Sequence, residues 1–205
     1  MTPEFWNEAT KHLAKRDKVL RQMVKSFPQG DLVSRGDPFQ TLARAIVGQQ
    51  ISVKAAASIW NRFATLAGRM TPANVAALAD ESLRGCGFSG QKVAYVKDLA
   101  RRFDSGAVKP RRWGRMQDEA IIEELIEVKG IGRWTVEMFL IFHLRRPDVL
   151  PVGDLGLQRA MERHFNEGEP LTRDEMRALG EPWAPYRSVA TWYLWRSLDP
   201  IPVEY

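Results

Sequence analysis

Cysteine is almost absent from this sequence: Cys86 is the single one among 205 residues. One cysteine excludes a disulfide framework, a cysteine zinc site and a four-cysteine iron–sulfur cluster within the chain. Long apolar runs are also lacking. The longest, around residues 138–144, is far shorter than the roughly 20 residues that a membrane-spanning helix needs. Residues 1–18 contain no apolar signal core, so we expect the protein to stay in the compartment where it is made.

The composition is that of an ordinary globular protein, with 44% hydrophobic and 27% charged residues. These proportions exclude disordered, collagen-like and coiled-coil chains. The length suffices for one domain, or for two closely packed lobes, with a core of their own. Lys and Arg (30) exceed Asp and Glu (25), which gives a net charge of +5. This charge permits a polyanionic partner without requiring one.

Helical signals run along nearly the whole chain. Apolar residues recur at helical spacing over 53–64, 121–126 and 155–165, and no segment alternates with period two. N-capping residues precede proline at Thr2, Asp37 and Thr71, and Thr172 with Glu175 forms a capping box. The sequence therefore predicts a compact all-α protein of short helices joined by Gly/Pro turns.

A first glycine motif, Gly85-Cys86-Gly87-Phe88-Ser89-Gly90, matches the dinucleotide-binding pattern G-x-G-x-x-G. That interpretation needs a strand before the motif and an acidic residue after a second strand. An alanine-rich helical stretch over 73–83 precedes it instead, and no strand follows. We predict a glycine-rich turn between two helices, the second over 91–103.

A second glycine motif spans residues 125–136. It predicts a helix that ends at Val128, a Gly130-Ile131-Gly132 turn and a second helix that begins near Arg133. Backbone amides in such a turn, with the positive end of a helix behind them, suit a phosphate oxygen, and Lys129 and Arg133 add charge. An ordinary interhelical turn with surface cations explains the same spacing.

Residues 125–136 resemble the hairpin of the helix-hairpin-helix (HhH-GPD) DNA glycosylase superfamily. The resemblance continues, in order, through residues 46–52, 150–157 and 185–188, and is closest to the DNA-3-methyladenine glycosylase II branch. It implies a single all-α, two-lobed unit over 1–205. Residues 39–150 would form a central helical lobe, 1–38 and 151–205 a second lobe, and the cleft between them would receive the flipped base.

Asp154 is the catalytic residue that the resemblance implies. In this family the aspartate after the hairpin faces the deoxyribose of an extruded nucleotide, where it can stabilise the oxocarbenium charge and orient or deprotonate water. The competing interpretation is a helix N-cap, because Asp154 lies where the helix over 155–165 should begin. The two roles are compatible, since a helix start favours an ionised carboxylate.

Trp134 and Trp195 are the base-pocket residues that the resemblance implies, with an interpretation as core residues open for both. An electron-rich indole face suits a cationic alkylated base, and aromatic side chains hold flipped bases. Bifunctional members of the superfamily carry a catalytic lysine at position 134. Tryptophan there implies a monofunctional enzyme that leaves an abasic site.

The resemblance also assigns the DNA contacts. Residues 49–52 resemble the loop that enters the minor groove, with either Gln50 or Ile51 as the wedge. A polar loop between two helices is the alternative interpretation. The full set of expected DNA-binding residues is Gln49, Gln50, Ile51, Ser52, Lys129, Gly130, Gly132, Arg133 and Thr135. The backbone carbonyls of Ile126, Val128 and Ile131 would hold a structural Na⁺ or K⁺, and no cofactor is expected for catalysis.

The sequence thus leads us to expect a DNA repair enzyme that removes alkylated purines such as 3-methyladenine from duplex DNA. We expect a monomer with double-stranded damaged DNA as its partner and no membrane association. It would be cytoplasmic and nucleoid-associated in a bacterium or archaeon, and nuclear in a eukaryote. The alternatives are a non-catalytic helix-hairpin-helix DNA-binding module and a sibling glycosylase for oxidised or mismatched bases.

Overall fold

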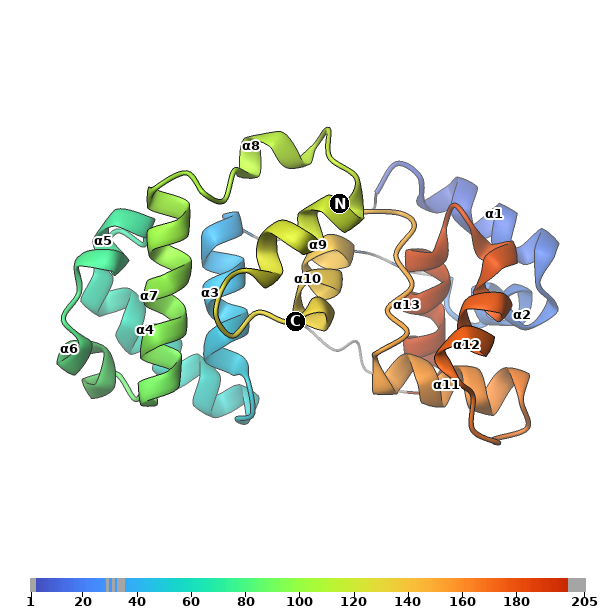
Figure 1. Ribbon diagram of the computed structural model, residues 1–205. Coiled ribbons are helices and arrows are strands. Elements are labelled where there is room, and N and C mark those ends of the chain that lie inside the picture. Colours follow the sequence, from blue (N-terminus) through green and yellow to red (C-terminus); the bar gives the residue numbers. More distant parts are fainter. Residues whose placement is uncertain (1–2, 29, 31, 33–35, 199–205) are drawn as a thin grey trace. The chain divides into compact units, whose positions relative to one another are not determined.

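The computed structural model describes residues 3–28, 30, 32 and 36–198, and every regular element in them is helical (Figure 1). This confirms the all-α prediction. No helix in this part of the chain is both long and apolar enough to cross a membrane.

The contacts divide the chain into two compact units. Unit 1 comprises residues 1–34 and 140–205, and unit 2 comprises residues 35–139. We expected these boundaries after residues 38 and 150, so the first lies close to its expected place and the second lies earlier in the chain. The second boundary differs because residues 140–149 bind unit 1: the Val149 N–H donates to Ser188 Oγ at 2.9 Å, and the Ser188 N–H donates to the Pro147 carbonyl at 3.0 Å.

Unit 2 is built around one long helix, α7, which packs against α3 and α5 (Figure 1). Val93, Val96 and Leu99 lie three residues apart on α7 and are buried, as its apolar spacing requires. The helices of this unit are α3 (Pro38–Gly48), α4 (Val53–Ala67), α5 (Pro72–Ala77), α6 (Asp80–Gly85), α7 (Gly90–Asp104), α8 (Pro110–Trp113), α9 (Asp118–Ile126) and α10 (Arg133–Met138).

Unit 1 is organised around α13, which packs against α1, α2 and α11. Six residues of α13 are buried, including Ser188 and Thr191, so this helix is enclosed on most of its sides. The helices of unit 1 are α1 (Trp6–Arg16), α2 (Lys18–Ser26), α11 (Leu155–Phe165), α12 (Arg173–Gly180), the 3₁₀ turn η2 (Glu181–Trp183) and α13 (Arg187–Leu198). A π-helical turn, η1 (Phe139–His143), spans the junction between the two units.

The predicted helix starts are confirmed at three of the four positions. Asp37 and Thr71 cap α3 and α5 through their side chains, and Thr172 forms the predicted capping box with Glu175. Thr2 lies outside the described residues. The first helix begins at Trp6, after a turn in which the Trp6 N–H donates to the Pro3 carbonyl.

The first glycine motif is a turn between α6 and α7, as predicted, and the helix expected over 91–103 is α7. The helical stretch expected over 73–83 is made of two short helices, α5 and α6. Leu78 and Ala79 have extended backbone between them, and this ends one helix before the next begins.

Candidate functional site

Asp154 is the N-cap of α11 and one of the few buried polar residues of unit 1. Its Oδ1 accepts hydrogen bonds from the Leu157 N–H and from Trp195 Nε1, both at 2.7 Å. The residue is 7% exposed. The N-cap interpretation is therefore confirmed, and the same bonds hold the carboxylate in one orientation at the positive end of a helix.

Trp195 lies on α13 and links the Asp154 carboxylate to η1. Its ring stacks on Phe142 of η1, with centroids 5.8 Å apart and planes 14° apart, while its Nε1 donates to Asp154. The sequence analysis left this residue open between pocket wall and core. The structure gives it a third task, which is to orient the side chain of Asp154.

Gly156 contributes to this arrangement by having no side chain. A Cβ on Gly156 would lie 3.1 Å from Asp154 Oδ1 and 3.2 Å from Trp195 Cδ1, closer than most Cβ atoms approach their neighbours. The resemblance includes this glycine within residues 150–157, but no role was expected for it. A glycine in the first turn of a helix, two residues after a capping aspartate, is the sequence signal that could have identified it.

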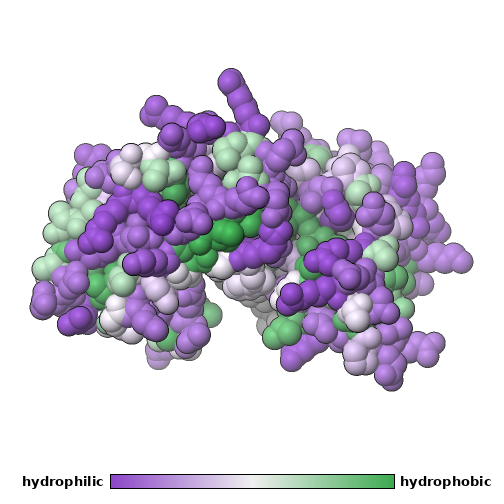
Figure 2. Space-filling model, in the orientation of Figure 1, coloured by the Kyte–Doolittle hydropathy of each residue, from purple (hydrophilic) through white to green (hydrophobic). Residues whose placement is uncertain are grey.

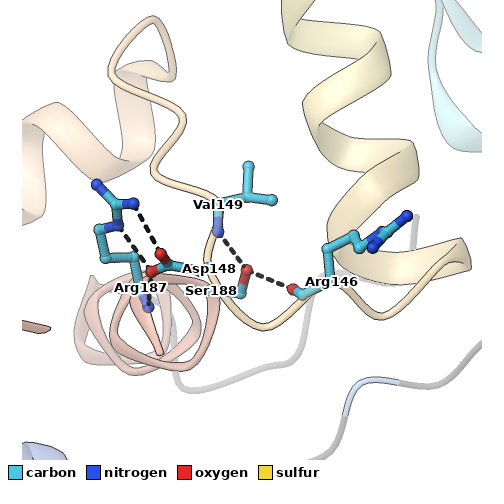
Figure 3. A network of polar contacts seen from close by, with 5 residues as sticks. All are labelled: Arg146, Asp148, Val149, Arg187 and Ser188. Carbon is cyan, nitrogen blue, oxygen red and sulfur yellow. Dashed lines mark hydrogen bonds and ion pairs between the residues drawn. The ribbon is translucent and has the colours of Figure 1, made fainter. Parts of the chain in front are cut away.

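The segment that leads to Asp154 is anchored to the start of α13 by the network in Figure 3. Arg187 donates from Nε and Nη2 to the two carboxylate oxygens of Asp148, both at 2.7 Å. Ser188 Oγ donates to the Arg146 carbonyl at 2.6 Å and accepts from the Val149 N–H. Arg187 and Ser188 therefore fix the chain just ahead of Asp154.

Burial alone would raise the pKa of Asp148, but the hydrogen bonds and the charge of Arg187 outweigh burial and hold that pKa below its ordinary value. Arg187 responds in the opposite sense, because the hydrogen bond to Asp148 raises its pKa. Both shifts favour the charged pair.

The hairpin of unit 2 is a tight turn between α9 and α10. The Ile131 N–H donates to the Val128 carbonyl at 3.1 Å, and Gly130 has φ +79°, a conformation that glycine adopts without strain. The second helix begins at Arg133, as predicted. The first ends at Ile126 instead of Val128, because the chain already turns at Glu127.

Among the predicted hairpin contacts, Lys129 and Gly132 are exposed and Thr135 is half-buried. Arg133 is engaged within the protein: it binds Glu119 through two nitrogens at 2.6–2.9 Å and lies 3.6 Å from Glu137. The pair with Glu119 joins two exposed side chains, and such pairs contribute at most about 1 kcal/mol.

Trp134 lies on α10 in unit 2 and is 41% exposed, so it is not a core residue. By contrast, four other tryptophans are buried in the core: Trp6, Trp60, Trp113 and Trp183. Trp192 is half-buried, in ring contact with Trp6 and Tyr193. Trp134 thus lies partly exposed at the surface of its unit.

The loop between α3 and α4 presents its polar and apolar side chains outward. Gln50 is exposed with φ +58°, and Ile51 and Val53 are 37% and 84% exposed. Ser52 has a structural task, because its Oγ accepts the Ala55 N–H at 3.2 Å and caps α4. Gln49 is half-buried and donates from Nε2 to the Gly130 carbonyl at 2.8 Å. This bond joins the loop to the hairpin.

The three carbonyls predicted to hold a cation differ in the hydrogen bonds that they accept. The Val128 carbonyl accepts the Ile131 N–H. No hydrogen bond within the described residues reaches the carbonyls of Ile126 or Ile131. Each of the three carbonyl oxygens therefore keeps at least one lone pair that could ligate a cation.

Other charged residues lie on a surface that is largely hydrophilic in the view of Figure 2. An open hollow of about 450 Å³ lies in the segment that follows α7. It is lined by Arg111, Arg112, Arg115 and Met116.

Comparisons with known proteins identify the family of this chain. The family model described as "HhH-GPD superfamily base excision DNA repair protein" matches residues 43–185. DNA-3-methyladenine glycosylase 1 of Schizosaccharomyces pombe is 34% identical, and the match covers 91% of this chain and 85% of that protein.

Two solved structures are similar throughout the chain. A DNA-3-methyladenine glycosidase from Bacillus halodurans superimposes with a TM-score of 0.88 at 36% identity, covering 93% of this chain and 89% of that one. A 3-methyladenine DNA glycosylase of Schizosaccharomyces pombe in complex with abasic DNA gives 0.79 at 34% identity, covering 96% and 100%. The chain belongs to the HhH-GPD superfamily of base excision DNA repair proteins, within its DNA-3-methyladenine glycosylase branch.

Proposed function

We propose that this DNA glycosylase hydrolyses the N-glycosidic bond of alkylated purines such as 3-methyladenine in duplex DNA and leaves an abasic site. The observation that carries the proposal is the Asp154 carboxylate, buried and held by Leu157 N–H and Trp195 Nε1. A protein that only binds DNA needs no carboxylate oriented in this way.

Asp154 would act on the sugar. Cleavage of the glycosidic bond builds positive charge on the deoxyribose, and a preoriented carboxylate stabilises that charge without reorganising. The same carboxylate can orient or deprotonate the attacking water. An N3- or N7-alkylated purine already carries a positive charge and leaves easily, so one carboxylate suffices and no second acid is required.

Trp134 would recognise the damaged base. Its exposed indole attracts a cationic ring by roughly 0.5–2 kcal/mol, an advantage that a neutral purine lacks. The side chain cannot form a Schiff base, so strand cleavage is not expected. Borohydride treatment during turnover should trap no covalent protein–DNA adduct, and an adduct would contradict the monofunctional assignment.

Duplex DNA would be held by unit 2. The hairpin offers glycine amides and Lys129 to a phosphate, and the loop over 49–52 offers Gln50 and Ile51 to the minor groove. A Na⁺ or K⁺ held by the carbonyls of Ile126, Val128 and Ile131 would add positive charge near that phosphate. Catalysis would need no cofactor, and the enzyme would act as a monomer.

Excision assays on matched duplexes test the proposal directly. Duplexes carrying 3-methyladenine, 7-methylguanine, hypoxanthine or a mismatched thymine would be incubated with the enzyme and then treated with alkali to reveal abasic sites. We expect release of the two methylated purines. Release of hypoxanthine or thymine alone would favour a sibling glycosylase, and binding with no release would favour a DNA-binding module.

A further inference from the structure

Lys92, at the start of α7, reaches across to the end of α3. Its Nζ donates to the carbonyl of Val47 at 2.7 Å and to the carbonyl of Gln49 at 2.8 Å. These carbonyls lie where α3 ends and the loop over 49–52 begins. A cation at the carboxyl end of a helix is favourable, and here it also fixes the backbone that enters the loop.

The side chain of Gln49 continues this connection. While its own carbonyl accepts from Lys92, its Nε2 donates to the Gly130 carbonyl at 2.8 Å. Gln49 therefore links Lys92 on one side to the tip of the hairpin on the other. Gln50, the next residue, has φ +58° and is exposed, so the chain reverses immediately after the linked residue.

The same helix also holds the hairpin. Asp98, six residues after Lys92 on α7, accepts the Lys129 N–H at 2.9 Å through Oδ2, which also binds Arg102 at 3.1 Å. Tyr95, between Lys92 and Asp98 on α7, lies so close to Gly130 that a Cβ on Gly130 would overlap the Tyr95 ring. Residues 92, 95 and 98 share one stripe of α7 at helical spacing.

We propose that Lys92 and Gln49 are positioning residues for base extrusion: they brace the loop over 49–52 against the hairpin. In this proposal Gln49 is not the DNA contact that the resemblance implies, because its Nε2 already binds the Gly130 carbonyl. The inference rests on the proposed function, since it concerns how that function removes a nucleotide from the stack. A side chain at position 50 or 51 can fill the vacated space only if it keeps a fixed distance from the hairpin that holds the backbone. Displacement by about 1 Å can cost on the order of 100-fold in rate.

The burial of Lys92 supports this assignment. Its side chain is half-buried, and desolvation lowers its pKa, which means that it has exchanged hydration for the two carbonyls. A lysine that served as a phosphate contact would keep its ammonium group in water.

Lys97 provides a matched control on the same helix. Its Nζ also binds a backbone carbonyl, that of Leu78, and it lies 3.2 Å from Asp80 Oδ1. Its partners belong to the connection between α5 and α6, away from the loop and the hairpin. We call the contacts of Lys92 and Gln49 with the loop and the hairpin the brace. Lys97→Met removes a lysine–carbonyl contact from the same helix and leaves the brace intact.

The experiment compares Lys92→Met, Gln49→Leu and Lys97→Met with the parent chain. The first readout is single-turnover release of 7-methylguanine opposite cytosine and opposite a tetrahydrofuran abasic analogue. Extrusion costs less where the opposite base is missing. For the two brace variants we expect the rate of 7-methylguanine release to fall at least tenfold opposite cytosine and less than threefold opposite tetrahydrofuran. Lys97→Met should show no such difference between the two duplexes. Lys92→Arg should restore most of the rate.

The second readout is a binding measurement that does not depend on base excision. We would measure the ratio of affinities for a tetrahydrofuran-containing duplex and for the same duplex intact. The brace variants should lose this preference at unchanged affinity for intact DNA. The double variant should lose no more than the more affected single one, because both act on one loop.

Three outcomes would overturn the brace: equal rate losses on both duplexes, unchanged rates and affinity ratios, or equal losses in the Lys97→Met control. Melting temperatures identify any variant that fails to fold, in which case Lys92→Gln and Gln49→Glu replace it. If the parent chain releases no base at all, the proposed function fails. The affinity ratio then still tests whether Lys92 and Gln49 brace the loop.

Discussion

Trp195 Nε1 and the Leu157 N–H donate to the same oxygen of Asp154, each over 2.7 Å. The two donors come from α13 and from the first turn of α11, so the carboxylate is oriented by helices that pack together in unit 1. Its position is set by the folded protein before any DNA arrives. Such preorganisation is what gives a charged group its effect on a transition state.

Asp154→Asn should abolish excision while the fold and DNA binding persist. Asparagine is an equally good N-cap, so α11 keeps its first hydrogen bond, whereas the negative charge that stabilises the sugar is lost. Excision would be measured in single turnover, with DNA affinity and melting temperature in parallel. Base release at a near-normal rate would contradict the catalytic role.

Asp154→Ala separates the two tasks of this residue. It removes the cap as well as the charge, so we expect the same loss of excision together with about 1 kcal/mol of destabilisation. In a protein of this length that corresponds to roughly 2–4 °C in melting temperature. An alanine variant as stable as the asparagine variant would show that the cap contributes little.

Trp195→Phe isolates the indole N–H. Phenylalanine can still stack on Phe142, but it has no donor for Asp154 Oδ1. A hydrogen bond to a charged group contributes about 1.5–3 kcal/mol, so kcat should fall by roughly tenfold or more while KM changes little. A fall in DNA affinity with unchanged kcat would assign Trp195 to binding instead.

What the sequence could and could not predict follows from the range of the interactions involved. The caps at Asp37, Thr71 and Thr172, the start of α10 at Arg133 and the helix after Asp154 were predictable, because each depends on residues within four positions. The bonds from Trp195 to Asp154 and from Gln49 to Gly130 span 41 and 81 residues. No local pattern encodes them.

The break between α5 and α6 shows a further limit. Helix propensity over 73–83 is high, yet Leu78 and Ala79 are extended, and the Leu78 carbonyl accepts from Lys97 of α7. A tertiary contact takes precedence over local preference there. The role of Gly156 was missed for a related reason, since only the folded structure brings the Trp195 ring against it.

Gly156→Ala should reduce activity without reducing stability. The new methyl group would meet Asp154 Oδ1 at 3.1 Å and Trp195 Cδ1 at 3.2 Å, so it must displace the indole, the carboxylate or both by a few tenths of an ångström. Alanine is the better helix former, by about 1 kcal/mol. We therefore expect a lower kcat at an equal or higher melting temperature. Unchanged kcat would show that the site tolerates this displacement.

Acid should weaken the anchor of the Asp154 segment. The Asp148 pKa lies below its ordinary value because Arg187 binds the charged form more strongly than burial disfavours it. A carboxyl with a depressed pKa stabilises the fold fully at pH values above its unfolded pKa of about 3.9, and this stabilisation is lost as the pH falls through the folded pKa. Asp148→Asn should lower the melting temperature by roughly 3–8 °C at pH 7. The difference from the parent should shrink as the pH falls from about 5 to 3, because the parent then loses its own pair.

The exposed ion pair of Asp174 with Arg177 supplies the matched control for this pH series. Its carboxylate is 93% exposed, so Asp174→Asn should change the melting temperature little at any pH. Thermal melts of the parent and both variants at pH 7, 5, 4 and 3 would make the comparison. A deficit of Asp148→Asn that stayed constant across the series would mean that the pair with Arg187 is not the source of the stabilisation. A deficit shared equally by Asp174→Asn would mean that net charge, and not the anchor, controls the response to acid.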